Sequence, residues 1–280
     1  MIRHYTSLST LALILKHKTI RFNRLDRVDD ISESTAYGRY DLSKYLFVSS
    51  WTSSSVESIP QWEQYADKMT GVRLSLPRSP FKFRRINPIE SEGVLDSAGL
   101  GVPAPLPWDR AFNDDYLLMP TYNDPDHFEH EVEYVPDPAA QYEGMVTEVV
   151  GEDGSVRISI NNTKMMGRYK SEVWAHQEEV RYVLFAMPGV PMSAAGLGDL
   201  EYQKRLIPHM VKSIRAGTGP EATFIDLDLD SAMLSDMVVT LGPLAEAGEK
   251  ALAEAAIETY APDVTLREST LAGTIRRPFR

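Results

Sequence analysis

The sequence contains no cysteine. Disulfide bonds, thiolate nucleophiles and metal sites built on sulfur are therefore excluded. No apolar run approaches the roughly 20 residues that a membrane-spanning helix needs, and the first residues lack the apolar core and cleavage site of a signal peptide. We therefore expect a cytoplasmic protein with no membrane contact.

Basic residues are scarce relative to acidic ones. The chain has 29 lysines and arginines against 40 aspartates and glutamates, which gives a net charge of -11. Proteins that bind nucleic acids broadly rely on basic side chains against phosphate, so this balance argues against that class. The densest basic stretch, residues 73–85, is interpreted as solvated surface charge, and a local RNA-binding groove is the alternative.

Several well-known motifs are also missing. There is no phosphate-cradling glycine loop, no dinucleotide fingerprint and no Gly-x-Ser-x-Gly elbow. His127 and His130 have a spacing that suits metal ligands, but the acidic, loop-like stretch around them favours an exposed polar segment. Asp226, Asp228 and Asp230 alternate as on one face of a strand, which favours a solvated face over a cation site. We therefore expect no metal.

Hydrophobic periodicity predicts the secondary structure. Predicted strands cover residues 2–5, 19–22, 45–51, 72–76, 131–135, 179–187, 224–229, 238–241 and 264–267, with a hairpin formed by 144–150 and 156–160. Predicted helices follow Thr6 or Ser7 and Pro60, and cover 200–215, with a kink or break at Pro208, and 244–260.

These elements predict the fold class. The strands do not alternate regularly with long helices, so we expect one α+β domain over residues 1–280, with a central mixed, largely antiparallel sheet and flanking helices. Residues 87–128 are rich in proline, glycine and aspartate, which predicts a long irregular insertion. Such a loop on a shared scaffold is a candidate for choosing a substrate.

Two short segments far apart in the chain carry the clearest chemical pattern. His4-Tyr5-Thr6-Ser7 puts a histidine and hydroxyl groups at the end of the first strand. The segment from Lys170 to Arg181 puts a glutamate at the start of a strongly apolar strand. Between them, residues 47–51 read Phe-Val-Ser-Ser-Trp.

Together with residues 19–22, 62–67 and 132–134, these segments form an ordered set. The set resembles a bacterial family known as domain of unknown function 2971, over nearly the whole chain. More distantly, the chain is similar to the ADP-ribosyltransferase superfamily, whose enzymes split NAD and transfer ADP-ribose. Those enzymes use a histidine or arginine on the first strand, an aromatic or serine-rich motif on the next, and a glutamate on a late strand.

The resemblance implies a role for particular residues. It places His4 in the first position, Ser49 in the second and Glu179 in the third, with Glu178 as the alternative glutamate. Val180 stands where related sequences often have an aromatic residue, so the choice between the two glutamates stays open. The residues implied in binding NAD, the substrate, are His4, Tyr5, Thr6, Arg21, Ser49, Trp51, Lys170 and Arg181.

The chemistry explains this choice. Cleavage of the nicotinamide–ribose bond builds positive charge on the ribose, as in glycoside cleavage, and a carboxylate such as Glu179 stabilises that charge. Arg181 shares a sheet face with Glu179 and is placed to pair with it or with a phosphate. His4 is expected to donate to a ribose hydroxyl. The candidates for holding the pyrophosphate are Arg21, Arg24, Arg27 and Lys170.

Binding of the nicotinamide follows the same reasoning. The backbone near Tyr5 and Thr6 is expected to hold the nicotinamide amide, and Tyr5 or Trp51 is placed to stack on a ring.

The acceptor of ADP-ribose stays open. A protein side chain, a nucleic-acid base or water would each serve, and toxin and anti-phage roles are among those open to such an enzyme. Two alternatives belong to other classes. In a non-catalytic binding module of the same fold, Glu179 and Arg181 would form an ordinary ion pair. The other alternative is an RNA-directed effector.

Overall fold

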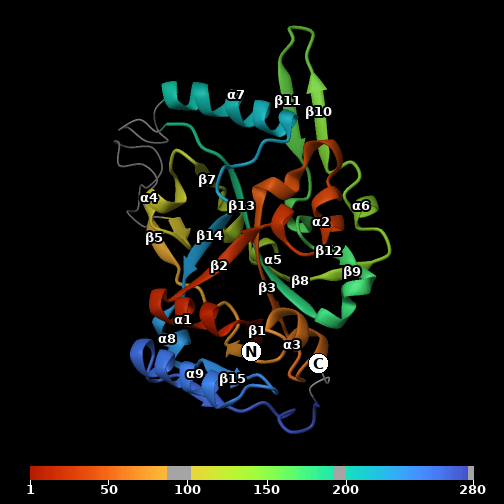
Figure 1. Ribbon diagram of the computed structural model, residues 1–280. Helices are drawn as coiled ribbons and strands as arrows, with labels where there is room; N and C mark the ends of the chain where they lie inside the picture. Colours follow the sequence, from red (N-terminus) through yellow and green to blue (C-terminus); the bar gives the residue numbers. More distant parts are fainter. Residues whose placement is uncertain (87–101, 192–199, 277–280) are drawn as a thin grey trace.

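A large mixed β-sheet flanked by helices forms the centre of the protein (Figure 1). The computed structural model describes residues 1–86, 102–191 and 200–276. The strands are β1 (Ile2–Thr6), β2 (Thr19–Arg24), β3 (Leu46–Thr52), β4 (Val72–Leu76), β5 (Arg84–Ile86), β6 (Val102–Ala104), β7 (Tyr116–Leu118), β8 (Glu129–Glu131), β9 (Glu133–Val135), β10 (Val146–Val150), β11 (Val156–Ile160), β12 (Tyr169–Ser171), β13 (Glu179–Pro188), β14 (Phe224–Asp228), β15 (Val238–Leu241) and β16 (Thr265–Arg267). The helices are α1 (Leu8–His17), α2 (Ile31–Thr35), α3 (Ile59–Tyr65), α4 (Trp108–Ala111), α5 (Pro125–Phe128), α6 (Pro138–Gln141), α7 (Leu200–Ala216), α8 (Ser231–Ser235) and α9 (Ala247–Tyr260).

The main sheet runs in the order β14-β2-β3-β1-β4-β15-β16, and β13 pairs with the other edge of β3. Its pairings are antiparallel except for the parallel pair β15–β16. The predicted mixed, largely antiparallel sheet with flanking helices is therefore confirmed.

The sheet splits along one edge of β3. The first half of β3 pairs with β2 through Val48, and its end pairs with β1 through Thr52. In the described part of the chain no strand pairs with residues 49–51 along this edge. The β2–β14 arm and the β1–β4–β15–β16 arm therefore separate at the middle of β3 (Figure 1).

Strand β13 is buried on both faces over its whole length. Its side chains alternate between two hydrophobic clusters, as the period of a strand requires. Val180, Tyr182 and Leu184 belong to the cluster that α1 and α9 cover, whereas Val183 and Phe185 belong to the cluster on the opposite face. Glu179 and Arg181 share the second face, and this places two charged side chains inside the protein.

The stretch after β5 differs from the predicted irregular insertion. Residues 87–101 lie outside the described residues. Residues 102–128 form short elements, among which β7 pairs with β13 and α5 packs against it. Apolar residues between the prolines, such as Leu106, Leu118 and Phe128, are buried in the same hydrophobic cluster as Val180 and Tyr182. Their burial explains why this stretch packs against the core.

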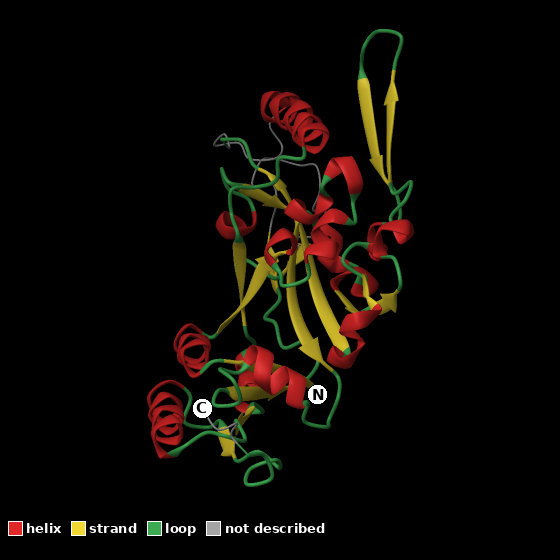
Figure 2. Ribbon diagram, turned by 45° about the vertical axis from the view of Figure 1, so that its right-hand side comes forward, coloured by secondary structure: helices red, strands yellow, loops and turns green. Residues whose placement is uncertain are grey.

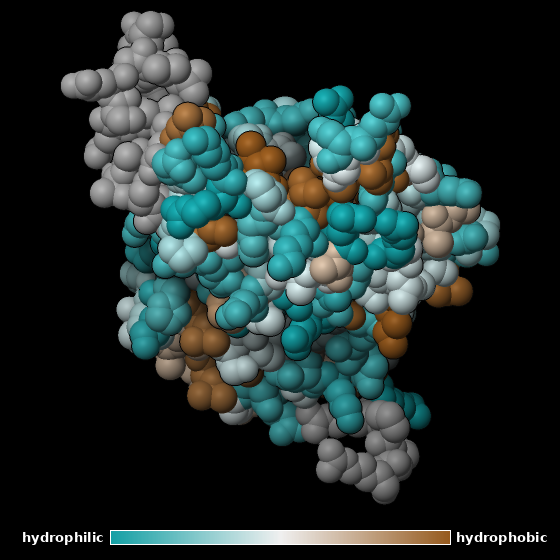
Figure 3. All heavy atoms as spheres, turned by 90° about the horizontal axis from the view of Figure 1, so that it is seen from above, coloured by the Kyte–Doolittle hydropathy of each residue, from teal (hydrophilic) through white to brown (hydrophobic). Residues whose placement is uncertain are grey.

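Two further elements bear on the sequence predictions. The hairpin β10–β11 is confirmed and projects from the body of the protein (Figure 2). Helix α7 continues through Pro208 without a break, so the split that was one of the two predicted outcomes is absent. Seen from above, the face that carries α7 and the hairpin is mainly hydrophilic, with hydrophobic atoms in small separate groups (Figure 3).

Among the described residues, no helix is both long enough and apolar enough to cross a membrane.

Candidate functional site

A pocket of about 310 Å³ lies where the sheet splits at β3. Its volume falls within the range that is typical of small-molecule sites. The predicted site residues that line it are His4, Tyr5, Arg21, Ser49, Trp51, Lys170 and Glu179. The split therefore brings together the first strand, the serine-rich strand and the late glutamate, as the resemblance implied.

His4 reaches across the split to β3. Its Nδ1 donates to the carbonyl oxygen of Ser50 at 2.9 Å, in the part of β3 that lacks a strand partner on this edge. Because a carbonyl only accepts, this contact places the proton on Nδ1 and leaves Nε2 as an acceptor in the neutral ring. Burial lowers the pKa of His4, and the bond to Ser50 opposes that change in part. The Trp51 ring lies 5.1 Å away, between centroids.

Glu179 is 3% exposed and starts β13 at the wall of the pocket. Burial alone would raise the pKa of its carboxyl, but the charges of Arg181 and Lys170 outweigh burial and bring the pKa to about 2. The Ser50 hydroxyl also contributes to lowering the pKa of Glu179. At neutral pH the pocket therefore contains a fixed negative charge.

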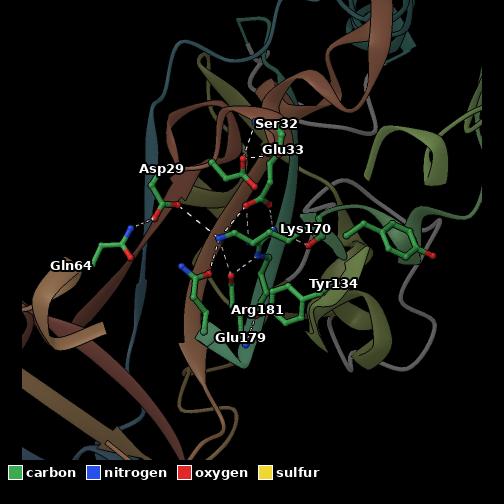
Figure 4. A network of polar contacts seen from close by, with 12 residues as sticks. Asp29, Ser32, Glu33, Gln64, Tyr134, Lys170, Glu179 and Arg181 are labelled. Atoms are coloured by element: carbon green, nitrogen blue, oxygen red, sulfur yellow. Dashed lines mark hydrogen bonds and ion pairs between the residues drawn. The ribbon is translucent and has the colours of Figure 1, made fainter. Parts of the chain in front are cut away.

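A network of buried charges surrounds Glu179 (Figure 4). Arg181 Nε donates to Glu179 Oε1 at 2.7 Å, and Lys170 Nζ lies 3.3 Å from Oε2. Both cations also contact Glu33, which is 2% exposed. Asp29 approaches Lys170 at 3.8 Å from the edge of the pocket. Two buried cations thus balance two buried carboxylates.

The structure separates the two candidate glutamates. Glu178 is exposed at the end of the turn before β13, with a positive φ of 44°. Glu179, by contrast, lines the pocket, and its backbone N–H donates to the Tyr134 hydroxyl at 2.9 Å. Lys170 is buried and pairs with Glu179.

The two serines of β3 face opposite sides of the sheet. Ser49 lies opposite Tyr182 and Ser50 lies opposite Arg181 in the register of β3 with β13, and paired side chains point to the same face. Ser49 accepts from Trp51 Nε1 at 3.0 Å and is 3% exposed. The hydroxyl that contacts Glu179 therefore belongs to Ser50, whereas the sequence selected Ser49.

Other predicted binding residues are already engaged within the protein. Arg21 forms a two-point ion pair with Asp226, at 2.9 and 3.1 Å. The Tyr5 ring packs edge-on against Trp62, and its hydroxyl accepts from a backbone N–H. Thr6 ends β1 outside the pocket. Its carbonyl oxygen lies so close to Gly71 that a Cβ atom at residue 71 would clash with it.

Two further arginines bring positive charge to the pocket, and of these the sequence predicted Arg27 but not Arg3. Arg3 and Arg27 line it, and in the described part of the chain neither pairs with a carboxylate. Lys170, in contrast, is 3% exposed, and its Nζ also donates to the Gln177 side-chain oxygen at 2.8 Å. Arg3 and Arg27 are therefore better placed than Arg21 or Lys170 to meet a phosphate.

Sequence reasoning missed several residues of the site. Those that line the pocket include Arg3, Asn23, Asp29, Ser50, Gln61, Tyr65 and Gln177. Glu33 lies behind them. No local pattern marks Glu33, because its burial depends on the contact of α2 with β12. The split of the sheet could not be foreseen without the strand register.

Two weaker predictions are wrong. His127 and His130 are buried, and burial lowers the pKa of each to about 4, so the exposed polar segment was wrong. Among the described residues no cluster suits a metal ion. Asp228 pairs with Arg84 and Arg110 instead of forming a solvated face.

The basic stretch of residues 73–85 is largely neutralised. Arg78 contacts Glu129 and Glu131, and Arg84 pairs with Asp228. These pairs leave little free charge for an RNA-binding groove at this place.

The low pKa of Glu179 predicts a dependence of stability on acid pH. A carboxyl whose pKa is lower in the folded protein than in the unfolded chain stabilises the fold above its unfolded pKa of about 4.5. That contribution is lost as the pH falls toward the folded value of about 2. We expect the free energy of unfolding to decline from pH 5 to pH 2, and to decline less in Glu179→Gln. Urea unfolding of the wild type and of Glu179→Gln across this pH range measures the two declines. An equal decline in the two proteins would contradict the low pKa of Glu179.

No family model, curated protein or solved structure matches the chain, and the family resemblance inferred from the sequence stays an expectation.

Proposed function

We propose that the protein binds NAD in the pocket at the split of the sheet and cleaves the nicotinamide–ribose bond, transferring ADP-ribose to a macromolecule. One observation carries this proposal: an ionised, buried Glu179 and a histidine of the first strand, held by the Ser50 carbonyl, line the same pocket. A cytoplasmic location and an ADP-ribosyltransferase-like fold belong to the same proposal.

The chemistry follows from the charges. When the bond between the nicotinamide nitrogen and the ribose breaks, its electron pair leaves with the nicotinamide and positive charge develops on the ribose. Glu179 provides a fixed negative charge for that ribose, without reorganisation. Neutral His4 offers Nε2 as an acceptor for a ribose hydroxyl, instead of donating to it as the sequence predicted, because its Nδ1–H is committed to Ser50. Arg3 and Arg27 are placed to hold the pyrophosphate.

The ADP-ribose then passes to a nucleophile. A protein side chain, a nucleic-acid base or water completes the reaction by forming the new bond to the ribose carbon and releasing a proton. A role as a bacterial toxin or anti-phage effector would suit transfer to a macromolecule.

One observation favours a second candidate, a non-catalytic binding module. Both carboxylate oxygens of Glu179 already contact a cation, Arg181 or Lys170. In such a module the network would only hold the fold together. Nicotinamide release separates the two candidates.

The test measures the rate of nicotinamide release from NAD by the purified wild type and by the purified His4→Ala variant. We expect release by the wild type and a loss of about 10²-fold in His4→Ala, in the range for a positioned polar group at a reacting centre. Exposed His17→Ala, on α1 outside the pocket, is the control with unchanged release. No release and no NAD binding by calorimetry would reject the enzyme and favour the binding module.

A further inference from the structure

Arg181 lies behind the wall of the pocket, between two carboxylates. Its Nε donates to Glu179 Oε1 at 2.7 Å, and its terminal nitrogens bind both oxygens of Glu33, one of them at 3.2 Å. A third contact, at 2.9 Å, joins it to the carbonyl of Gly167. The three charged residues are 1–3% exposed. The guanidinium is therefore held on three sides and contacts the pocket only through Glu179.

We propose that Glu33 and Arg181 form a positioning pair: Glu33 locks the guanidinium, and the guanidinium locks the orientation of the Glu179 carboxylate toward the pocket. This inference rests on the proposed function of Glu179. The planar fork of arginine suits it for the task, because two-point contacts fix direction as well as distance. The sequence had assigned Arg181 to NAD binding; in the structure it acts through another residue.

Glu33 also sets the charge balance around Glu179. The groups that face Glu179 or its two cations come from several neighbouring elements and are Asp29, Glu33, Ser50, Tyr65, His130, Tyr134, Tyr142, Lys170, Gln177 and Arg181. Without Glu33, Glu179 would be the single buried carboxylate beside two buried cations. With Glu33 in place, a second carboxylate contacts both cations and balances their charge.

The first experiment separates positioning from substrate binding. Glu33→Gln and Arg181→Lys keep most of the shape but lose the two-point ion pair. We expect kcat for nicotinamide release to fall about 10²-fold, as for a reacting group displaced by about 1 Å, with KM for NAD within twofold of the wild type. Arg84→Gln, which removes an ion pair outside the pocket, is the control with unchanged kcat. Unchanged kcat in both test variants would overturn the proposal.

The second experiment does not depend on activity. The side-chain carboxyl signal of Glu179 is followed by carbon-13 NMR through a pH titration and is identified by its loss in Glu179→Gln. In Arg181→Met, burial is no longer offset by the nearest cation, so we expect the carboxyl to titrate at higher pH than in the wild type. Arg181→Lys retains the charge and is expected to titrate nearer the wild type. Identical titrations in all three proteins would reject the role of Arg181.

The two experiments also separate this inference from the proposed function. A wild type that releases no nicotinamide would reject the proposed function, and the titration would still decide whether Arg181 holds Glu179 ionised. Nicotinamide release with unchanged kcat in the variants and an unmoved titration would reject the positioning pair alone.

Discussion

Glu179→Gln is expected to release nicotinamide from NAD about 10²–10³-fold more slowly than the wild type, which is the range for losing one preorganised electrostatic contact in an active site. Glutamine has nearly the same shape but no charge, so it cannot stabilise the positive ribose. The carboxylate is buried and ionised in the resting protein, and little reorganisation would precede the reaction. NAD affinity, measured by calorimetry, is expected to stay within a few-fold of the wild type.

The chain offers a matched control in the adjacent residue. Glu178→Gln makes the same chemical change at an exposed position outside the pocket, and its rate of release is expected to equal that of the wild type. Urea unfolding of both variants shows whether the loss in Glu179→Gln reflects a smaller folded fraction. Equal rates in the two folded variants would contradict a catalytic Glu179.

Lys170→Met is expected to cause the largest loss of stability, about 3–5 kcal/mol in the free energy of unfolding, as measured for broken buried ion pairs. Lys170 is 3% exposed and contacts Glu179 at 3.3 Å and Glu33 at 3.4 Å. Without the ammonium, two buried carboxylates would share the single charge of Arg181. Urea unfolding at pH 7 measures the change, provided that the free energy of unfolding depends on urea concentration with the same slope in the variant and the wild type.

An exposed lysine provides the comparison. Lys164 pairs with Asp124 and Asp126 in solvent, where ion pairs contribute little. Lys164→Met is therefore expected to leave the free energy of unfolding nearly unchanged. A loss in Lys170→Met no larger than that of Lys164→Met would show that the network around Glu179 is hydrated in solution.

Local patterns in the chain predict much of the secondary structure. Ser7 caps α1 by accepting from the N–H of Thr10, as a hydroxyl before an apolar helix predicts. The hairpin forms around residues 151–155, where Gly154 adopts a positive φ of 78°. Such features depend on neighbours in sequence, and for this reason they can be recognised without the fold.

Pro208 and residues 102–128 show where local reasoning fails. Proline removes one hydrogen bond from a helix, yet α7 continues through it, and Tyr202 and Ile214 near its two ends are buried. The prolines of residues 102–128 predicted a loop, but burial of the short apolar runs between them adds strands and helical turns to the core. In both places tertiary packing outweighs the local preference.

The sequence by itself determined the alternating strands, the mixed sheet and the residue types of the candidate site, because these depend on periodicity and composition. Only the tertiary structure decided that β3 pairs with β13 in the register that turns Ser50 toward Glu179 and Ser49 away. It also decided that Glu33 is buried behind Arg181. The physical reason is that a shift of one residue in a strand reverses the face of every side chain, and that a buried charge is stable only where distant partners meet it.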